Sequence, residues 1–92
     1  MAMQDRENGD WGWVTYSRMR VLRELSADRT EREAAEVLGM SYDGLRSIVE
    51  TIKEQAGLES VREMRGWWRQ NRGFWLEWVL EQAGMSEEGY GR

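Results

Sequence analysis

Apolar residues recur at three- and four-residue spacing along most of the chain, a pattern typical of helices with one buried face. The pattern is clearest within residues 41–56, where the apolar positions are Leu45, Ile48, Val49, Ile52 and Ala56. No segment shows the alternation of apolar and polar residues that is typical of a half-buried strand. The sequence therefore predicts an all-α protein.

Capping signals set the boundaries of these helices. Four hydroxyl residues stand where a predicted helix begins, namely Thr15, Thr30, Ser41 and Ser60. Glu33 follows Thr30 by three residues, so this pair is predicted to form a capping box. Gly39 and Gly57 follow the second and third helices, where a left-handed residue often ends a helix. The predicted helices span residues 16–26, 31–38, 42–56 and 61–71.

A further, Trp-rich helix is predicted after residue 73, because Asn71 and Gly73 resemble a break between two helices. We expect a flexible N-terminal segment over residues 1–13, with Trp11 and Trp13 anchoring the start of the fold on its core. The other expected divisions are a helix-turn-helix domain over 14–72, an additional C-terminal helix over 73–84, and a flexible acidic tail over 85–92.

Composition argues against several classes of protein. The chain of 92 residues has no cysteine and no histidine, so it lacks disulfides, thiolate metal sites and the commonest general base. It also has no phosphate-binding loop and no paired-carboxylate motif, and we therefore expect no enzyme, cofactor or metal site. No apolar run approaches the ~20 residues that span a bilayer. Residues 1–10 lack the apolar stretch of a secretory signal, so we expect a cytoplasmic protein.

The second and third predicted helices have the features of a helix-turn-helix. Ala35 is a small residue where the two helices approach, and Gly39 can take the positive φ that the turn requires. Ser41 caps the next helix, whose apolar stripe faces the first. The predicted architecture is therefore a helix-turn-helix bundle of four helices plus the C-terminal Trp-rich helix.

The wider register from residue 14 to residue 68 resembles the LuxR/GerE helix-turn-helix family without a gap. The matching residues are Thr15, Val21, Leu22, Leu25, Thr30, Glu33, Ala35, Leu38, Gly39, Met40, Ser41, Leu45, Arg46, Ile52, Gly57, Leu58, Ser60, Glu63 and Trp67. The resemblance implies a four-helix domain whose third helix enters the DNA major groove and whose fourth helix commonly pairs two protomers.

This resemblance leads to our first functional hypothesis, a transcriptional regulator that binds double-stranded DNA as a homodimer. The helix over residues 41–56 would enter the major groove. The residues expected to contact DNA are Thr30, Tyr42, Asp43, Arg46, Ser47, Glu50 and Lys53.

The charge on the same helix supports a second hypothesis. The protein has a net charge of −4, and Asp43, Glu50 and Glu54 are predicted on the helix face opposite Leu45. Carboxylates repel phosphates, although they can also accept a hydrogen bond from cytosine. The alternative is a protein-interaction module whose acidic third helix binds a basic protein. Arg46 and Lys53 either contact phosphate or pair with Glu50, and the sequence leaves both roles open.

The fourth helix and the Trp-rich helix are the predicted dimer interface. Its expected members are Val61, Arg65, Trp67, Trp68, Trp75 and Trp78. On a helical wheel Trp67 points away from Met64 and Trp68, so its ring is expected to be exposed and available to a partner. Four arginines share a sector of roughly 80° on the fourth helix. They are Arg62, Arg65, Arg69 and Arg72, and they either bind an acidic partner or cover the tryptophans.

Overall fold

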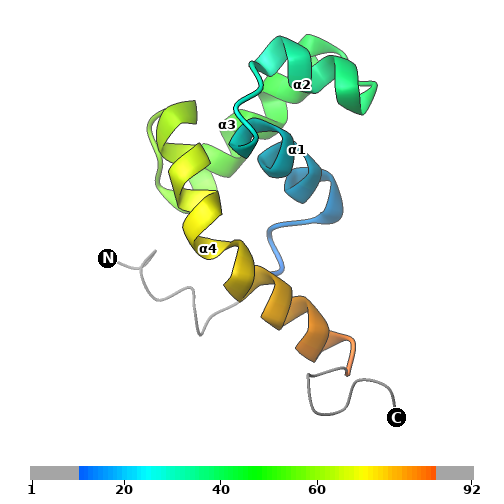
Figure 1. Cartoon of the computed structure of the whole chain (residues 1–92), viewed down its shortest axis with the longest axis vertical. Coiled ribbons are helices and arrows are strands. Elements are labelled where there is room, and N and C mark those ends of the chain that lie inside the picture. Colours follow the sequence, from blue (N-terminus) through cyan, green and yellow to red (C-terminus); the bar gives the residue numbers. More distant parts are fainter. Residues whose placement is uncertain (1–10, 85–92) are drawn as a thin grey trace.

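The computed structural model describes residues 11–84 and confirms an all-α bundle of four helices (Figure 1). No strand occurs within these residues. The helices are α1 (Tyr16–Ser26), α2 (Glu31–Leu38), α3 (Tyr42–Ala56) and α4 (Val61–Gln82). The predicted flexible segments lie outside the described residues, except for residues 11–13.

Side-chain hydroxyls cap all four helices, as the sequence predicts. The amide of Gly44 donates to Ser41 Oγ over 3.0 Å, and Thr30 forms the full capping box with Glu33. Thr15 and Ser60 accept from the amides three residues further along the chain. Gly39 and Gly57 end α2 and α3 in the left-handed conformation. These boundaries are local features, which explains why the pattern alone locates them.

The predicted break at residues 71–73 is wrong, because α4 continues without interruption to Gln82. The Asn71 side chain donates to the Trp67 carbonyl over 2.8 Å and thus stays within the helix. An interior glycine such as Gly73 costs a helix only about 1 kcal/mol. Packing of Trp75 and Trp78 against the core offsets that cost. The predicted fifth helix is therefore the second half of one helix about 33 Å long.

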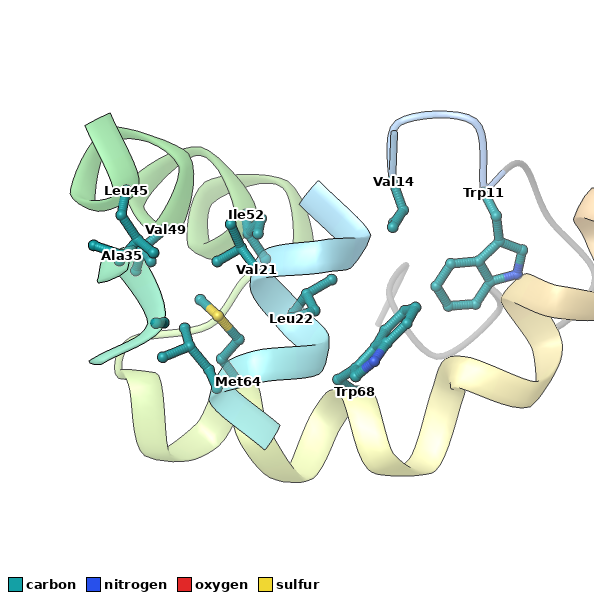
Figure 2. Packing of buried hydrophobic residues seen from close by; sticks show 12 residues of the cluster. Trp11, Val14, Val21, Leu22, Ala35, Leu45, Val49, Ile52, Met64 and Trp68 are labelled. Atoms are coloured by element: carbon teal, nitrogen blue, oxygen red, sulfur yellow. The ribbon is translucent and has the colours of Figure 1, made fainter. Parts of the chain in front are cut away.

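The hydrophobic core is a single cluster built around α1, which packs against each of the other three helices (Figure 2). The predicted inward positions of α1 and α2 are buried, except for Leu38, which is half-buried. The buried apolar residues of the cluster are Trp11, Val14, Val21, Leu22, Leu25, Ala34, Ala35, Leu45, Val49, Ile52, Met64 and Trp68. Three aliphatic residues of α3 and two residues of α4 thus close the core from opposite sides of α1.

The segment before α1 is fixed along the middle of α4, at Trp67 and Trp75. Trp11 is fully buried, and Trp13 packs against the core, as predicted. The Trp67 ring lies 5.9 Å from the Trp11 ring and 5.8 Å from the Trp13 ring. The indole nitrogen of Trp75 donates to the Val14 carbonyl over 3.0 Å. We refer to Trp11, Trp13, Trp67, Trp68 and Trp75 as the tryptophan cluster.

Candidate nucleic-acid interface

A tight turn holds α2 against α3. The amide of Met40 donates to the Ala35 carbonyl over 2.9 Å, while Gly39 has φ +69°. Ala35 is 4% exposed, as expected for a small residue beneath the turn. Ser41 then starts α3 in a new direction. This local geometry is a helix-turn-helix, and it depends on a glycine because other residues rarely adopt positive φ.

One side of α3 is buried and the other side is open. The buried stripe consists of Leu45, Val49, Ile52 and Ala56. The exposed residues include Asp43, Ser47, Glu50 and Glu54, which the sequence places opposite Leu45. The helix is therefore anchored by its aliphatic stripe and presents its polar side to solvent. This outer face carries three carboxylates and one hydroxyl.

Glu50 binds both cations of α3. Its Oε2 lies 3.3 Å from Arg46 Nη2 and 3.1 Å from Lys53 Nζ. Arg46 also reaches back to Glu31 at the start of α2, with Nη1 3.4 Å from Oε1. A side-chain hydrogen bond with Tyr42, and then the charge of Glu31, raise the pKa of Arg46 above its ordinary value. The sequence leaves open whether Arg46 and Lys53 contact phosphate or pair with Glu50. In the protomer, both cations pair with Glu50.

The first turns of α2 and α3 lie side by side. The guanidinium of Arg32 stacks over the Tyr42 ring at 4.2 Å, parallel to the link between Arg46 and Glu31. Thr30, another predicted contact residue, is exposed, and its hydroxyl caps α2. The structure thus brings Thr30, Tyr42 and Arg46 into one region.

Sequence reasoning missed Glu31 and Arg32 as members of this region, although both lie in the first turn of α2. Their contacts cross the turn between two helices, so no spacing within one helix indicates them. Only the relative register of α2 and α3 could have identified them, and this register depends on the glycine turn. Ser47, Glu50 and Lys53 lie further along α3, and Glu50 is joined to this region by its ion pair with Arg46.

The predicted interface residues of α4 mostly stabilise the protomer. Trp68 is 3% exposed and belongs to the core, and Trp75 is held by its bond to Val14. Trp67 is half-buried, because Trp11 and Trp13 cover the ring that the helical wheel places outside. Val61 and Trp78 are also half-buried and pack against the core. The apolar side chains most exposed on α4 are instead Phe74, at 37%, and Leu76, at 52%.

Two of the four arginines on α4 cap the end of α1. Arg65 donates to the carbonyls of Leu25 and Arg29, each over 2.9 Å. Arg69 donates to the Ser26 carbonyl and pairs with Asp28 at 2.9 Å. A cation at a helix C-terminus satisfies free carbonyls and favours the negative end of the helix dipole. Arg65, which the sequence places in a dimer interface, therefore has a role within the protomer.

Comparison of the chain with protein-family models, with curated proteins and with solved structures finds no match. Over residues 11–84, no helix is both long enough and apolar enough to cross a membrane. The same residues contain no group of three or more acidic side chains placed to hold a metal ion.

Proposed function

We propose that the protein is a DNA-binding transcriptional regulator that acts as a homodimer and inserts α3 into the major groove. The observation that carries this proposal is the open outer side of α3, which follows a glycine turn from α2 and is anchored by a buried aliphatic stripe. The major groove of B-DNA, about 12 Å wide, admits one α-helix in this manner. The resemblance to the LuxR/GerE family over residues 14–68 supports the same arrangement.

The residues of α3 divide into two roles under this proposal. Ser47, Asp43 and Glu50 face the base edges, where a carboxylate accepts a hydrogen bond from the amino group of cytosine. Arg46 and Lys53 flank these residues. As the helix docks, both cations leave their ion pairs with Glu50 and bind a DNA phosphate instead. Thr30 and Tyr42, at the starts of α2 and α3, lie beside the backbone of the duplex. Phosphate contacts of this kind fix the register of a protein on DNA.

A second candidate function rests on the ion pairs of Glu50. Because Arg46 and Lys53 are both paired within the protomer, the outer side of α3 is dominated by Asp43, Glu50 and Glu54. Such a surface suits a basic protein better than a phosphate backbone. In this alternative the helix-turn-helix is a scaffold, and α3 is the contact surface of a protein-interaction module.

The test measures retention of the purified protein on mixed double-stranded DNA fragments as the salt concentration is varied. The first proposal expects binding at low salt that falls steeply as salt rises, since bound phosphates release counterions. Failure to bind DNA even at low ionic strength, with specific capture of a basic protein, would favour the second candidate.

A charge-reversal variant sharpens this test. Glu50→Lys should strengthen nonspecific DNA binding if α3 faces phosphates, and it should abolish binding of a basic protein in the alternative. Glu81→Lys is the matched control, because Glu81 is exposed on α4. The substitution changes the net charge by the same amount, but at a site far from α3. Equal gains in DNA affinity from both variants would show that only net charge matters, and α3 would lose its proposed role.

A further inference from the structure

A surface cavity lies between α1 and the second half of α4. Its volume is about 370 Å³, within the range of small-molecule sites. Its apolar lining comes from Met19 on α1 and from Trp68, Trp75 and Leu76 on α4. The Trp68 and Trp75 rings are 5.8 Å apart and tilted by 60°, so they pack on each other, and Trp75 is the more exposed of the two. An aromatic ring fits such a lining, because tilted and offset ring pairs are favourable.

The charged residues of this cavity are both positive. Arg23 on α1 and Arg72 on α4 line it from opposite sides, and no carboxylate is among the described residues that line it. Arg72 is exposed and makes no ion pair or hydrogen bond with the described part of the chain. Arg23 contacts Glu24 only at 3.6 Å. Two guanidinium groups beside an apolar pocket are complementary to a single anionic group on an apolar body.

From this combination we propose that the cavity binds a small aromatic carboxylate, with its ring against Met19, Trp75 and Leu76 and its carboxylate at Arg23 and Arg72. The cavity lies on α1 and α4 and not on the outer side of α3, so it does not overlap the residues proposed to contact DNA. Bridging α1 and α4 also makes the ligand stabilise the folded state.

Gly73 provides a direct way to close the site. It lies in the middle of α4 and lines the cavity, and a Cβ atom built there meets no atom within 4 Å. Gly73→Leu therefore fills the cavity without a steric clash at Cβ, while removing a glycine from a helix. Gly66 is equally open and helical but does not line the cavity. Gly66→Leu is thus the matched control for the effect of leucine on α4.

The experiment uses isothermal titration calorimetry of the full chain with 2-naphthoate as the probe. The cation 1-naphthylmethylammonium carries a similar ring and the opposite charge. We expect 2-naphthoate to bind at least tenfold more tightly than the cation, and to shift the indole NMR signals of Trp68 and Trp75. Gly73→Leu should weaken 2-naphthoate binding at least tenfold, whereas Gly66→Leu should leave it unchanged. Arg72→Gln should reduce the preference for the anion.

Three results would overturn the proposal. The first is equal binding of the two probes, which would show a merely apolar surface. The second is that the Gly73→Leu variant keeps its helix content and binds 2-naphthoate as tightly as the wild type. The third is that 2-naphthoate does not bind at all. Sedimentation of the protein would then show whether a second copy of the chain covers the cavity. A loss of DNA binding in any variant would not bear on these outcomes.

Discussion

At the scale of single residues, Glu50 has the largest influence on the charge that α3 presents. Its side chain is 55% exposed, and yet it pairs with both Arg46 and Lys53. Exposed pairs of this kind contribute less than about 1 kcal/mol to stability. Their effect on recognition is larger, because they decide whether the two cations are available to a phosphate.

Glu50→Gln should therefore raise DNA affinity at low salt with little change in the free energy of unfolding. Each additional phosphate contact adds about 0.9 to the slope of log K against log salt, so freeing two cations should steepen that slope by roughly one to two. Fluorescence anisotropy with labelled duplex at several salt concentrations measures it. Glu54→Gln is the control, because Glu54 is exposed on the same helix without a pairing partner among the described residues. Identical slopes for the two variants would argue against this role of Glu50.

Arg65 offers a prediction about stability at the same scale. Arg65→Ala removes two hydrogen bonds donated by a half-buried cation, one to the Leu25 carbonyl at the end of α1 and one to the Arg29 carbonyl before α2. It should lower the free energy of unfolding by about 1–3 kcal/mol. Urea denaturation followed by circular dichroism provides the measurement. Arg62→Ala should change stability by less than about 0.5 kcal/mol, because Arg62 is exposed on the same helix and donates no hydrogen bond to another residue between 11 and 84. Similar losses in both variants would contradict the capping role.

These residues show which contacts the sequence could reveal. Ser41 and Gly44 interact within one turn, and the capping box of Thr30 and Glu33 has a fixed spacing, so pattern alone predicts both. Arg65 and Leu25 are 40 residues apart. Their contact depends on how α4 crosses α1, which no local spacing encodes. The predicted dimer role of Arg65 followed from the family resemblance, which implies that the fourth helix pairs protomers, and that resemblance does not show what Arg65 contacts within one protomer.

At the scale of the elements, α4 is where sequence and structure differ most. Asn71 and Gly73 are common at helix ends, and their proximity predicted a break. Helix continuity is decided by tertiary packing as well as by propensity, and Trp68, Trp75 and Trp78 hold both halves of α4 on one core. The helix-turn-helix was predictable because its glycine, cap and apolar stripe all lie within a short stretch of chain.

The two glycines inside α4 lead to a prediction at this scale. Gly66→Ala and Gly73→Ala should each raise the free energy of unfolding by about 0.5–1 kcal/mol, because both positions are helical and leave open space for a methyl group. Chemical denaturation measures the change. Gly39→Ala should have the opposite effect, since φ is +69° at that turn. Destabilisation by Gly73→Ala would indicate that α4 is not a continuous helix in solution.

At the scale of the whole molecule, the second half of α4 extends beyond the other helices (Figure 1) and exposes Phe74 and Leu76. Much of the interface predicted from sequence is used within the protomer. Under the homodimer proposal, Phe74 is therefore the exposed apolar residue of this half-helix, outside the cavity, that is left to contact a second copy. The distinction could not be drawn from sequence, because a tryptophan that fills a core and one that meets a partner have the same spacing.

If α4 forms the homodimer, Phe74→Glu should shift the protein to monomers and weaken DNA binding. A buried carboxylate without a partner is costly at an interface. Analytical ultracentrifugation over a range of concentrations checks the mass. Val37→Glu is the control, because Val37 is 52% exposed on α2, away from α4. A wild-type protein that stays monomeric at all concentrations would refute the homodimer and leave the fold unaffected.

The bond between Trp75 and Val14 joins positions separated by 61 residues of chain. It places the start of the described chain and the last turns of α4 in a single cooperative unit. Removing the residues before Val14 should therefore make the end of α4 more sensitive to proteases. Truncating α4 before Trp75 should in turn loosen Val14, while Trp11 and Trp13 keep their contacts with Trp67. A cut that removes Trp11 and Trp13, or one that removes Trp75, should therefore make the protein less resistant to heat, although neither cut lies in α3.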